Sequence, residues 1–177
     1  MTSRKELLAH IHIKQGDITK ESTDAIVNAA NPRLLGGGGV DGAIHRAAGP
    51  GLLEECRKLG GCNHGEARIT GGHMLKARYV IHTPGPIYKN GKSGEPQILI
   101  NSYINSLLLA KEHNLTSISF PAISTGVYGY PKEDACKIAV DSSLEFMQQN
   151  DYLIDINFVL FDKDNVDAYN YYIKTLK

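Results

Sequence analysis

Four consecutive glycines, at residues 36–39, restrict the folds open to this chain more than any other feature of its sequence. They follow a short apolar segment at residues 25–28, and they precede Asp41 and an alanine-rich stretch typical of the start of a helix. Glycine loses more conformational entropy on ordering than any other residue, so a compact domain retains such a run where the backbone must approach something closely. Backbone N–H groups at a helix N-terminus bind anions, and phosphate is therefore the first candidate ligand.

Length and charge set the scale of the fold. We expect one domain spanning residues 1–177, because domains cluster at about 100–200 residues. A chain of this size buries roughly 70% of its unfolded surface, which is enough for a core without crosslinks. Nineteen basic residues balance nineteen acidic ones, which argues against a general nucleic-acid-binding protein because such proteins carry a basic excess. The neutrality is compatible with a phosphate held by backbone amides.

Cysteine content and hydrophobic patterning predict the compartment. The chain has three cysteines, so at least one has no disulfide partner within it, and the segment after Met1 does not resemble a signal peptide. No apolar run approaches the roughly 20 residues that are needed to cross a bilayer. We therefore expect a cytoplasmic protein that does not enter a membrane.

Strand and helix patterns alternate along the chain. Strands are predicted at residues 10–14, 25–28, 66–70, 79–83, 116–120 and 156–161, and helices at residues 40–48, 52–59, 96–111, 131–150 and 165–176. This alternation predicts an α/β sandwich with a largely parallel central sheet. Such sheets bind ligands beyond the carboxyl ends of their strands. The glycine-rich tract and a second glycine-containing loop at residues 122–130 both fall there, so we expect them to border one site.

Two nucleotide-binding motifs match the chain only in part. The pattern Gly37-x-Gly39-x-x-Gly42 fits the dinucleotide fingerprint, but it does not follow the preceding strand immediately, as that fingerprint requires. Residues 85–93 resemble a phosphate-binding P-loop, but the spacing is wrong and Pro86 removes an amide donor. We therefore set aside both a nicotinamide-dependent enzyme and a P-loop protein.

The histidines and cysteines do not form a convincing metal site. Cys56, Cys62 and His64 lie close together in the sequence, but a fourth ligand is not evident, and free cysteines usually serve as small core residues. His10 and His12 are expected on one face of a strand, with no obvious carboxylate partner, which favours a structural or surface role. No metal is predicted.

The glycine-rich loop has the character of a rigid anion cradle rather than of a flexible linker. Leu34, Leu35 and Val40 flank it, and we expect these apolar side chains to anchor it in the core. Asp41 begins the following helix, where a carboxylate caps the helix or interacts with its dipole. The dipole should lower the pKa of Asp41 and make it a weak base, suited to orienting a water or holding a ribose hydroxyl. His45 shares its helix face, as a structural partner or as a catalyst.

Two more polar residues each allow two interpretations. Asn31 precedes Pro32 in a common turn pattern, yet its amide, both donor and acceptor, also suits a sugar hydroxyl. Asp17 can cap a turn with Thr19. Alternatively, its carboxylate can accept a hydrogen bond from an exocyclic amine, which favours adenine over guanine.

Four motifs taken together resemble the macrodomain family. They are Gly16-Asp-Ile-Thr19, Val27-Asn-Ala-Ala-Asn31, Gly36-Gly-Gly-Gly-Val-Asp-Gly-Ala-Ile-His45 and Pro121-Ala-Ile-Ser-Thr-Gly-Val-Tyr-Gly-Tyr-Pro131. Each is moderately specific alone, but all four occur in the family's order and cover essentially the whole chain. The pattern resembles in particular the MacroD-type branch, which includes bacterial O-acetyl-ADP-ribose deacetylases. The resemblance implies a three-layer α/β/α sandwich with a mixed, mostly parallel sheet.

The resemblance also implies ADP-ribose as the ligand, with a role for each motif. Asp17 takes the adenine amino group, Ile18 positions the base, and Phe161 lies against its face. Asn31 and Asp41 meet the distal ribose, and the family associates Asp41 with water activation. Two loops grip the diphosphate: Gly37, Gly38, Gly39 and Val40 on one side, and Ser124, Thr125, Gly126, Val127 and Tyr128 on the other.

The implied reaction is hydrolysis of an acyl ester on the distal ribose. The acyl group is acetate or an Asp or Glu side chain of a mono-ADP-ribosylated protein, and no cofactor or metal is implied. Asp41, the substrate phosphate, or both together orient the attacking water. A non-catalytic ADP-ribose reader is the rival interpretation, and a regulatory partner of another protein, such as an RNA-processing enzyme, is a third.

The chain departs from the family pattern in two places. The segment His82-Thr-Pro84-Gly-Pro86 carries proline where the branch more often has valine, which stiffens a nearby loop without removing a proposed catalytic group. The adjacent Gln-Glu-Glu element of poly(ADP-ribose) glycohydrolases does not occur. Cleavage within poly(ADP-ribose) chains is therefore not expected.

Overall fold

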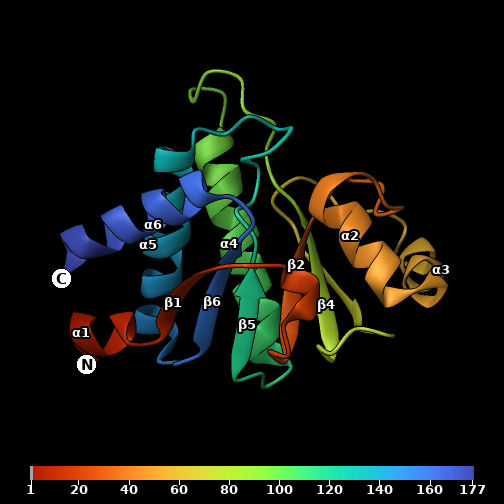
Figure 1. Cartoon of the computed structure of the whole chain (residues 1–177), viewed down its shortest axis with the longest axis horizontal. Helices are drawn as coiled ribbons and strands as arrows, with labels where there is room; N and C mark the ends of the chain where they lie inside the picture. Colours follow the sequence, from red (N-terminus) through yellow and green to blue (C-terminus); the bar gives the residue numbers. More distant parts are fainter. Residues whose placement is uncertain (1) are drawn as a thin grey trace.

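The computed structural model describes residues 2–177, which contain a six-stranded β-sheet (Figure 1). In the order in which they lie side by side, the strands are β1 (Ile11–Gln15), β6 (Asp155–Leu160), β5 (Ser117–Phe120), β2 (Ala25–Ala30), β4 (Tyr79–Pro84) and β3 (Arg68–Gly71). Neighbouring strands are parallel except β3 and β4, which are antiparallel. The sheet is therefore mixed and mostly parallel, as predicted.

Helices cover both faces of this sheet. They are α1 (Arg4–Leu8), α2 (Gly39–Ala48), α3 (Pro50–Leu59), α4 (Glu95–Glu112), α5 (Lys132–Asn150) and α6 (Lys163–Leu176), with a short 3-10 turn, η1 (Ile18–Lys20). Figure 1 shows α5 and α6 to one side of the sheet and α2 and α3 to the other. The expected three-layer α/β/α fold is confirmed. Among residues 2–177, no helix combines the length and the apolar character that crossing a bilayer requires.

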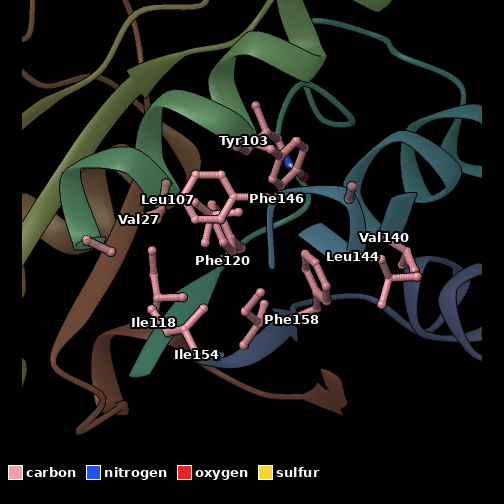
Figure 2. Packing of buried hydrophobic residues seen from close by; sticks show 14 of the residues in the cluster. Val27, Tyr103, Leu107, Ile118, Phe120, Val140, Leu144, Phe146, Ile154 and Phe158 are labelled. Atoms are coloured by element: carbon pink, nitrogen blue, oxygen red, sulfur yellow. Dashed lines mark hydrogen bonds between the residues drawn. The ribbon is translucent and has the colours of Figure 1, made fainter. Parts of the chain in front are cut away.

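The larger core fills the space between the sheet and the helices α4, α5 and α6. At its centre lie Tyr103 of α4, Phe120 of β5 and Phe158 of β6, seen together in Figure 2. Ring centroids are 5.0 Å apart for Tyr103 and Phe120, and 5.8 Å apart for Phe120 and Phe158. Burying a side chain of this size contributes about 1.5–3 kcal/mol, so this packing firmly fixes the ends of β5 and β6.

A smaller core lies on the opposite face, under α2 and α3. Ile26 of β2 and Val80 of β4 meet Ile44 of α2 and Leu52 of α3 there, and Leu34 joins them from the glycine-rich loop. Their burial holds α2 against the sheet. The first turn of α2 is thereby fixed beside the carboxyl end of β2.

Most helix boundaries differ from the prediction by one or two residues, and three further differences concern a whole helix or a cap. Helix α1 has no predicted counterpart, and Ser3 is its N-cap. Pro131, expected as the first helical residue of α5, is instead its N-cap. The expectation that Asn150 caps the end of α5 is wrong, because Asp151 ends the helix with a left-handed φ of 47°. Asn150 is the last helical residue, and its Nδ2 donates to the carbonyl of Phe146 at 2.9 Å.

The expectation that His10 and His12 lack a carboxylate partner is also wrong. Nδ1 of His10 lies 3.0 Å from Oδ1 of Asp155, and Nε2 of His12 lies 3.9 Å from the same atom. The parallel register of β1 and β6, with Ile11 opposite Ile156, brings this carboxylate between the two histidines. The contact is at the amino ends of these strands and is partly exposed, so it contributes at most about 1 kcal/mol.

Candidate active site

The predicted site residues lie at one edge of the sheet, beyond the ends of four parallel strands. Asp17 follows β1, Asn31 follows β2, the loop that contains Ser124 follows β5, and Phe161 follows β6. Parallel neighbours place their carboxyl ends at a common edge. Segments that are far apart in the sequence thus border the same region, as the sequence predicts. The role of each residue toward a ligand remains a prediction.

The glycine-rich loop connects β2 to α2 and packs closely on the helix. Gly36 and Gly39 have φ values of 90° and 56°, in the left-handed region that favours glycine. A Cβ on Gly42 would lie 2.5 Å from the carbonyl oxygen of Gly37, so the loop backbone lies directly against the first turn of α2. Only a residue without a side chain fits there.

Two of the three apolar residues that flank this loop anchor it. Leu34 is buried, and Val40 packs against the smaller core. Leu35, however, is 41% exposed, so the expectation that it anchors the loop is wrong.

Within residues 2–177, the amide N–H groups of Gly37 and Gly38 have no hydrogen-bond acceptor. Free amides beside a helix N-terminus are able to bind an anion, and anion binding by this loop stays a prediction.

Asp41 is buried in the first turn of α2. Its Oδ1 accepts a hydrogen bond from Nδ2 of Asn28 at 2.8 Å, and no side chain caps the helix, whose N-cap is Gly38. Burial raises the pKa of Asp41, although the hydrogen bond from Asn28 and the nearby His45 act to lower it. The expected lowering is therefore wrong, because lost solvation outweighs the interactions that favour the charged form. Asp41 is a stronger base than the sequence suggests.

Asn31 and Asp41 converge on Gly37. A Cβ on Gly37 would lie 3.1 Å from Oδ2 of Asp41 and 3.3 Å from Nδ2 of Asn31, so glycine keeps the space between them open. Asn31 also closes the turn, because its Nδ2 donates to the carbonyl of Gly36 at 3.0 Å and its Oδ1 accepts from the amide of Arg33 at 3.1 Å. The turn role is thus observed. One hydrogen of the Asn31 amide is left for a ligand.

His45 faces Asp41 from one turn further along α2. Its Nε2 lies 3.5 Å from Oδ1 of Asp41, which is within ion-pair distance. The alignment does not make a hydrogen bond, and Nε2 has no hydrogen-bond partner among residues 2–177. The expected pairing is therefore a close approach of a partly buried imidazole to a buried carboxylate.

The loop after β5 leaves several backbone groups without partners. Ser124 has a left-handed φ of 68°, and its buried Oγ has no hydrogen-bond partner in the described part of the chain. Its carbonyl accepts from the amide of Tyr130 at 2.8 Å, which closes the loop. In the same part of the chain, no acceptor meets the amides of Gly126, Val127 and Tyr128. Clustered free N–H groups of this kind suit an anion.

The residues that are predicted to meet adenine lie after the ends of β1 and β6. Oδ1 of Asp17 accepts from Oγ1 of Thr19 at 2.7 Å and from its amide at 2.9 Å, and the hydroxyl bond is the main cause that lowers the pKa of Asp17. The turn-capping interpretation is therefore observed. Ile18 is buried in the smaller core, whereas Phe161 is 89% exposed. An aromatic face this open is available to stack on a planar base.

The sequence did not lead to a predicted role for two buried polar residues behind Asp41. Asn28 of β2 contacts Asp41, and Nδ1 of His82 in β4 lies 3.1 Å from Nδ2 of Asn28. Both are fully buried. Each interrupts an apolar strand, and this polar interruption is the signal that could have identified them.

A third overlooked residue, Asn165, connects two of the site segments. Its Nδ2 donates to Oδ1 of Asp162 at 2.7 Å and to Oγ1 of Thr125 at 3.3 Å. Asn165 thereby joins the segment that follows β6 to the loop that follows β5. Its position in the first turn of an amphipathic helix gives no comparable sequence signal.

Cys56, Cys62 and His64 do not come together. The Sγ of Cys56 lies 3.8 Å from Nε2 of His82, whereas Nδ1 of His64 lies 2.7 Å from the carbonyl oxygen of Gly85. Burial raises the pKa of Cys56 and of Cys62 to about 11. Across residues 2–177, no three His, Cys, Asp or Glu side chains are grouped so as to hold a metal ion.

Comparison with known proteins gives consistent matches. The Macro domain family profile matches residues 27–139. A Macro domain-containing protein of Methanosarcina mazei is 54% identical over 163 residues, covering 92% of this chain and 87% of the relative. An O-acetyl-ADP-ribose deacetylase of Escherichia coli is 51% identical over 163 residues, covering 90% and 92%. A solved Trypanosoma brucei macrodomain in complex with ADP-ribose has a TM-score of 0.88 at 45% identity, covering 97% of this chain and 71% of that one.

These similarities agree with the geometry of the site. The matched residues 27–139 include Asn31, Asp41 and the loop after β5. The structural match extends the agreement to nearly the whole chain, including β1 and β6. The chain belongs to the Macro domain family.

Proposed function

We propose that this protein binds ADP-ribose and hydrolyses the ester of O-acetyl-ADP-ribose. The observation that carries the proposal is the convergence of Asp41 Oδ2 and Asn31 Nδ2 on the open space at Gly37, beside the N-terminus of α2. The names of the relatives support it: one is an O-acetyl-ADP-ribose deacetylase, and a structural neighbour holds ADP-ribose. A protein that only binds ADP-ribose needs no carboxylate at position 41.

In this proposal the ligand lies along the carboxyl edge of the sheet. The adenine amino group meets Asp17, and its face meets Phe161, with Ile18 positioning the base. The diphosphate takes the free amides of the two loops, and each hydrogen bond to a charged group contributes about 1.5–3 kcal/mol. The dipole of α2 adds to this attraction. Backbone donors thus allow a chain of zero net charge to bind two phosphates.

The chemistry occurs at the distal ribose. A water attacks the acyl carbon, the bond from that carbon to the ribose oxygen breaks, and the ribose oxygen takes up the proton that Asp41 has removed from the water; the acetic acid formed loses its own proton to solvent. Acetate and ADP-ribose leave. Asp41 Oδ2 receives the proton of the attacking water, and its raised pKa favours it over the substrate phosphate for this step. The free hydrogen on Nδ2 of Asn31 holds a ribose oxygen in place.

The same ester links ADP-ribose to Asp and Glu side chains, so we include mono-ADP-ribosylated proteins as substrates. A protein-linked acyl group needs an open exit from the site. Gly38 and Gly39 face open space, and Val127 is fully exposed, which leaves the rim accessible. The three free cysteines suit the reducing cytoplasm that we propose as the compartment.

Mass spectrometry of the products tests both activities. Purified protein is expected to release acetate from O-acetyl-ADP-ribose and ADP-ribose from Asp- or Glu-modified protein. Asp41→Ala should lower both rates by about 10²–10⁴-fold. Asp134→Ala, which removes an exposed aspartate from the first turn of α5, is the matched control and should leave them unchanged.

Three results would overturn parts of this proposal. Tight ADP-ribose binding by calorimetry without any turnover would identify a reader instead of an enzyme. Turnover of the acetyl ester alone would remove the protein substrates. Full activity of Asp41→Ala would refute the role of Asp41 and leave the substrate phosphate as the base.

A further inference from the structure

A continuous chain of buried polar side chains runs behind Asp41 and crosses three strands. Asn28 and His82 occupy the same register position on the neighbouring strands β2 and β4, and Thr70 lies on β3 beyond them. Nδ2 of Asn28 is 2.8 Å from Oδ1 of Asp41 and 3.1 Å from Nδ1 of His82. Nε2 of His82 is 2.9 Å from Oγ1 of Thr70. Asn28, His82 and Thr70 are each at most 2% exposed.

The direction of each hydrogen bond follows from the two ends of this chain. An ionised Asp41 carboxylate only accepts, so Asn28 presents its NH₂ group to it. The second hydrogen of that NH₂ group then points at Nδ1 of His82, which must carry a lone pair. At the other end, Oγ1 of Thr70 donates to the carbonyl of Gly71 at 3.2 Å and is free to accept from Nε2–H of His82. Both ends thus specify the same neutral tautomer.

The surroundings of His82 keep its ring uncharged. Burial, with the nearby His45, lowers the pKa of His82 to about 3. The groups that face the ring are Asn28, Thr70 and the thiol of Cys56, and His45 lies 6.5 Å away between ring centroids. None of the groups in contact with the ring is a carboxylate that would stabilise an imidazolium.

We propose that His82 is a positioning residue for the hydrolysis. As the Nε2–H tautomer it accepts from Asn28, fixes the orientation of that amide, and so holds Oδ1 of Asp41 while leaving Oδ2 free beside Gly37 and Asn31. The inference rests on the proposed function. Oδ1 of Asn28 has no hydrogen-bond partner within residues 2–177, so the two acceptors on Nδ2 alone determine which way this amide points.

Kinetics of two substitutions at one position test the role. His82→Asn places an oxygen acceptor near the position of Nδ1, whereas His82→Leu removes every acceptor. We expect His82→Leu to lower kcat for O-acetyl-ADP-ribose by about 10- to 100-fold, by analogy with the loss of an outer hydrogen-bond partner of a metal ligand. ADP-ribose Kd should change less than about 3-fold, and His82→Asn should recover most of kcat. His113→Asn and His113→Leu, at the end of α4, are matched controls with unchanged kinetics.

Equal kcat losses in the two His82 variants, or a loss confined to KM, would overturn the positioning role. Thermal melts of both variants separate loss of folding from loss of rate. If His82→Leu does not fold, the comparison of His82→Asn with Thr70→Val replaces it. Thr70→Val removes the acceptor of His82 Nε2–H but leaves the contact between His82 and Asn28, so its kcat should fall less than 10-fold. A larger fall would contradict the proposed donor-to-acceptor direction of these hydrogen bonds.

Long-range ¹H–¹⁵N NMR spectra of histidine-labelled wild-type protein test the tautomer without any turnover. We expect a neutral Nε2–H ring for His82 between pH 5 and pH 8, assigned by its loss in His82→Asn. An Nδ1–H tautomer or a protonated ring would overturn the inference. An inactive wild-type protein that nevertheless shows the Nε2–H tautomer would instead refute the proposed function, so the two failures are distinguishable.

Discussion

A methyl group added at Gly37 perturbs the space in which we place the reaction. The new Cβ would lie 3.1 Å from Oδ2 of Asp41 and 3.3 Å from Nδ2 of Asn31, closer than the ~3.5–4.0 Å of an ordinary contact. One or both side chains must therefore move by a few tenths of an ångström. The φ of Gly37 is outside the left-handed region, so the backbone itself accepts alanine. Gly37→Ala thus changes side-chain geometry in the site.

The expected magnitude follows from these distances. A catalytic group misplaced by 1 Å costs about 10²-fold in rate, so a shift of a few tenths of an ångström costs roughly 3- to 10-fold. The methyl group also occupies the approach to Oδ2, and we expect kcat/KM to fall by about 10²-fold in total, or ~2.7 kcal/mol. The free energy of unfolding should fall by up to about 2–3 kcal/mol, because the gain of about 0.4–1 kcal/mol from the unfolded chain offsets only part of an overpacking cost of about 1–3 kcal/mol.

Gly38→Ala is the matched control in the same loop. Its Cβ would meet no atom within 4 Å, and its φ of −95° suits alanine. Alanine lowers the entropy of the unfolded chain, which stabilises the variant, but it is a weaker N-cap than glycine, which destabilises it by a similar amount. The free energy of unfolding of Gly38→Ala should therefore stay within about 1 kcal/mol of the wild type. Steady-state kinetics, ADP-ribose calorimetry and urea unfolding are measured for both variants. Equal losses of kcat/KM in the two, or no loss in Gly37→Ala, would refute the assignment of the reaction to this space.

Two buried carboxylates give further predictions. Because burial raises the pKa of Asp41, its ionisation destabilises the folded state, so Asp41→Asn should raise the melting temperature at pH 7 while lowering the rate at least ~10²-fold. That gain should vanish as the pH falls below the ordinary value of 3.8, and a gain that persists there would exclude burial as the cause. Glu95 accepts hydrogen bonds from four backbone N–H groups in residues 89–93. These bonds, of which the one from Lys89 has the largest effect, lower the pKa of Glu95 to about 2. Glu95→Gln should therefore melt at a lower temperature above pH 4.5, with the difference closing toward pH 2, whereas a pH-independent difference would contradict this account.

The layers of the fold were predictable because each element carries its own local pattern. The run at residues 156–161 is apolar apart from Asn157, which is typical of a buried strand, and β6 is observed at Asp155–Leu160. Helix α1 escaped prediction because it has five residues and buries only Leu7, which is too short for a helical period to emerge. Caps depend on single dihedral angles, so Asp151 could take the place expected for Asn150.

That the candidate site residues lie at one edge of the sheet could also be predicted from the sequence, but the electrostatics of this edge could not. Glycines and polar residues directly after strands are visible in the sequence, and parallel topology gathers them at one edge. The pKa of Asp41 depends on how completely the packing of α2 against the sheet buries its carboxyl group, and that is a property of tertiary packing. The exposure of Leu35 has the same origin, because an apolar residue in a loop can face either way.

The buried hydrogen-bonded side chains behind Asp41 show which information the sequence lacks for predicting this site. Asn28 and His82 are 54 residues apart, and each interrupts an apolar strand, but no local pattern states that β2 lies beside β4. Once that pairing is known, alternation places both side chains on the face of Ile26 and Val80, under α2. Buried polar groups must find hydrogen-bond partners, so contact between them becomes the expected outcome. Strand order, more than residue identity, is therefore what a prediction of this site from its sequence requires.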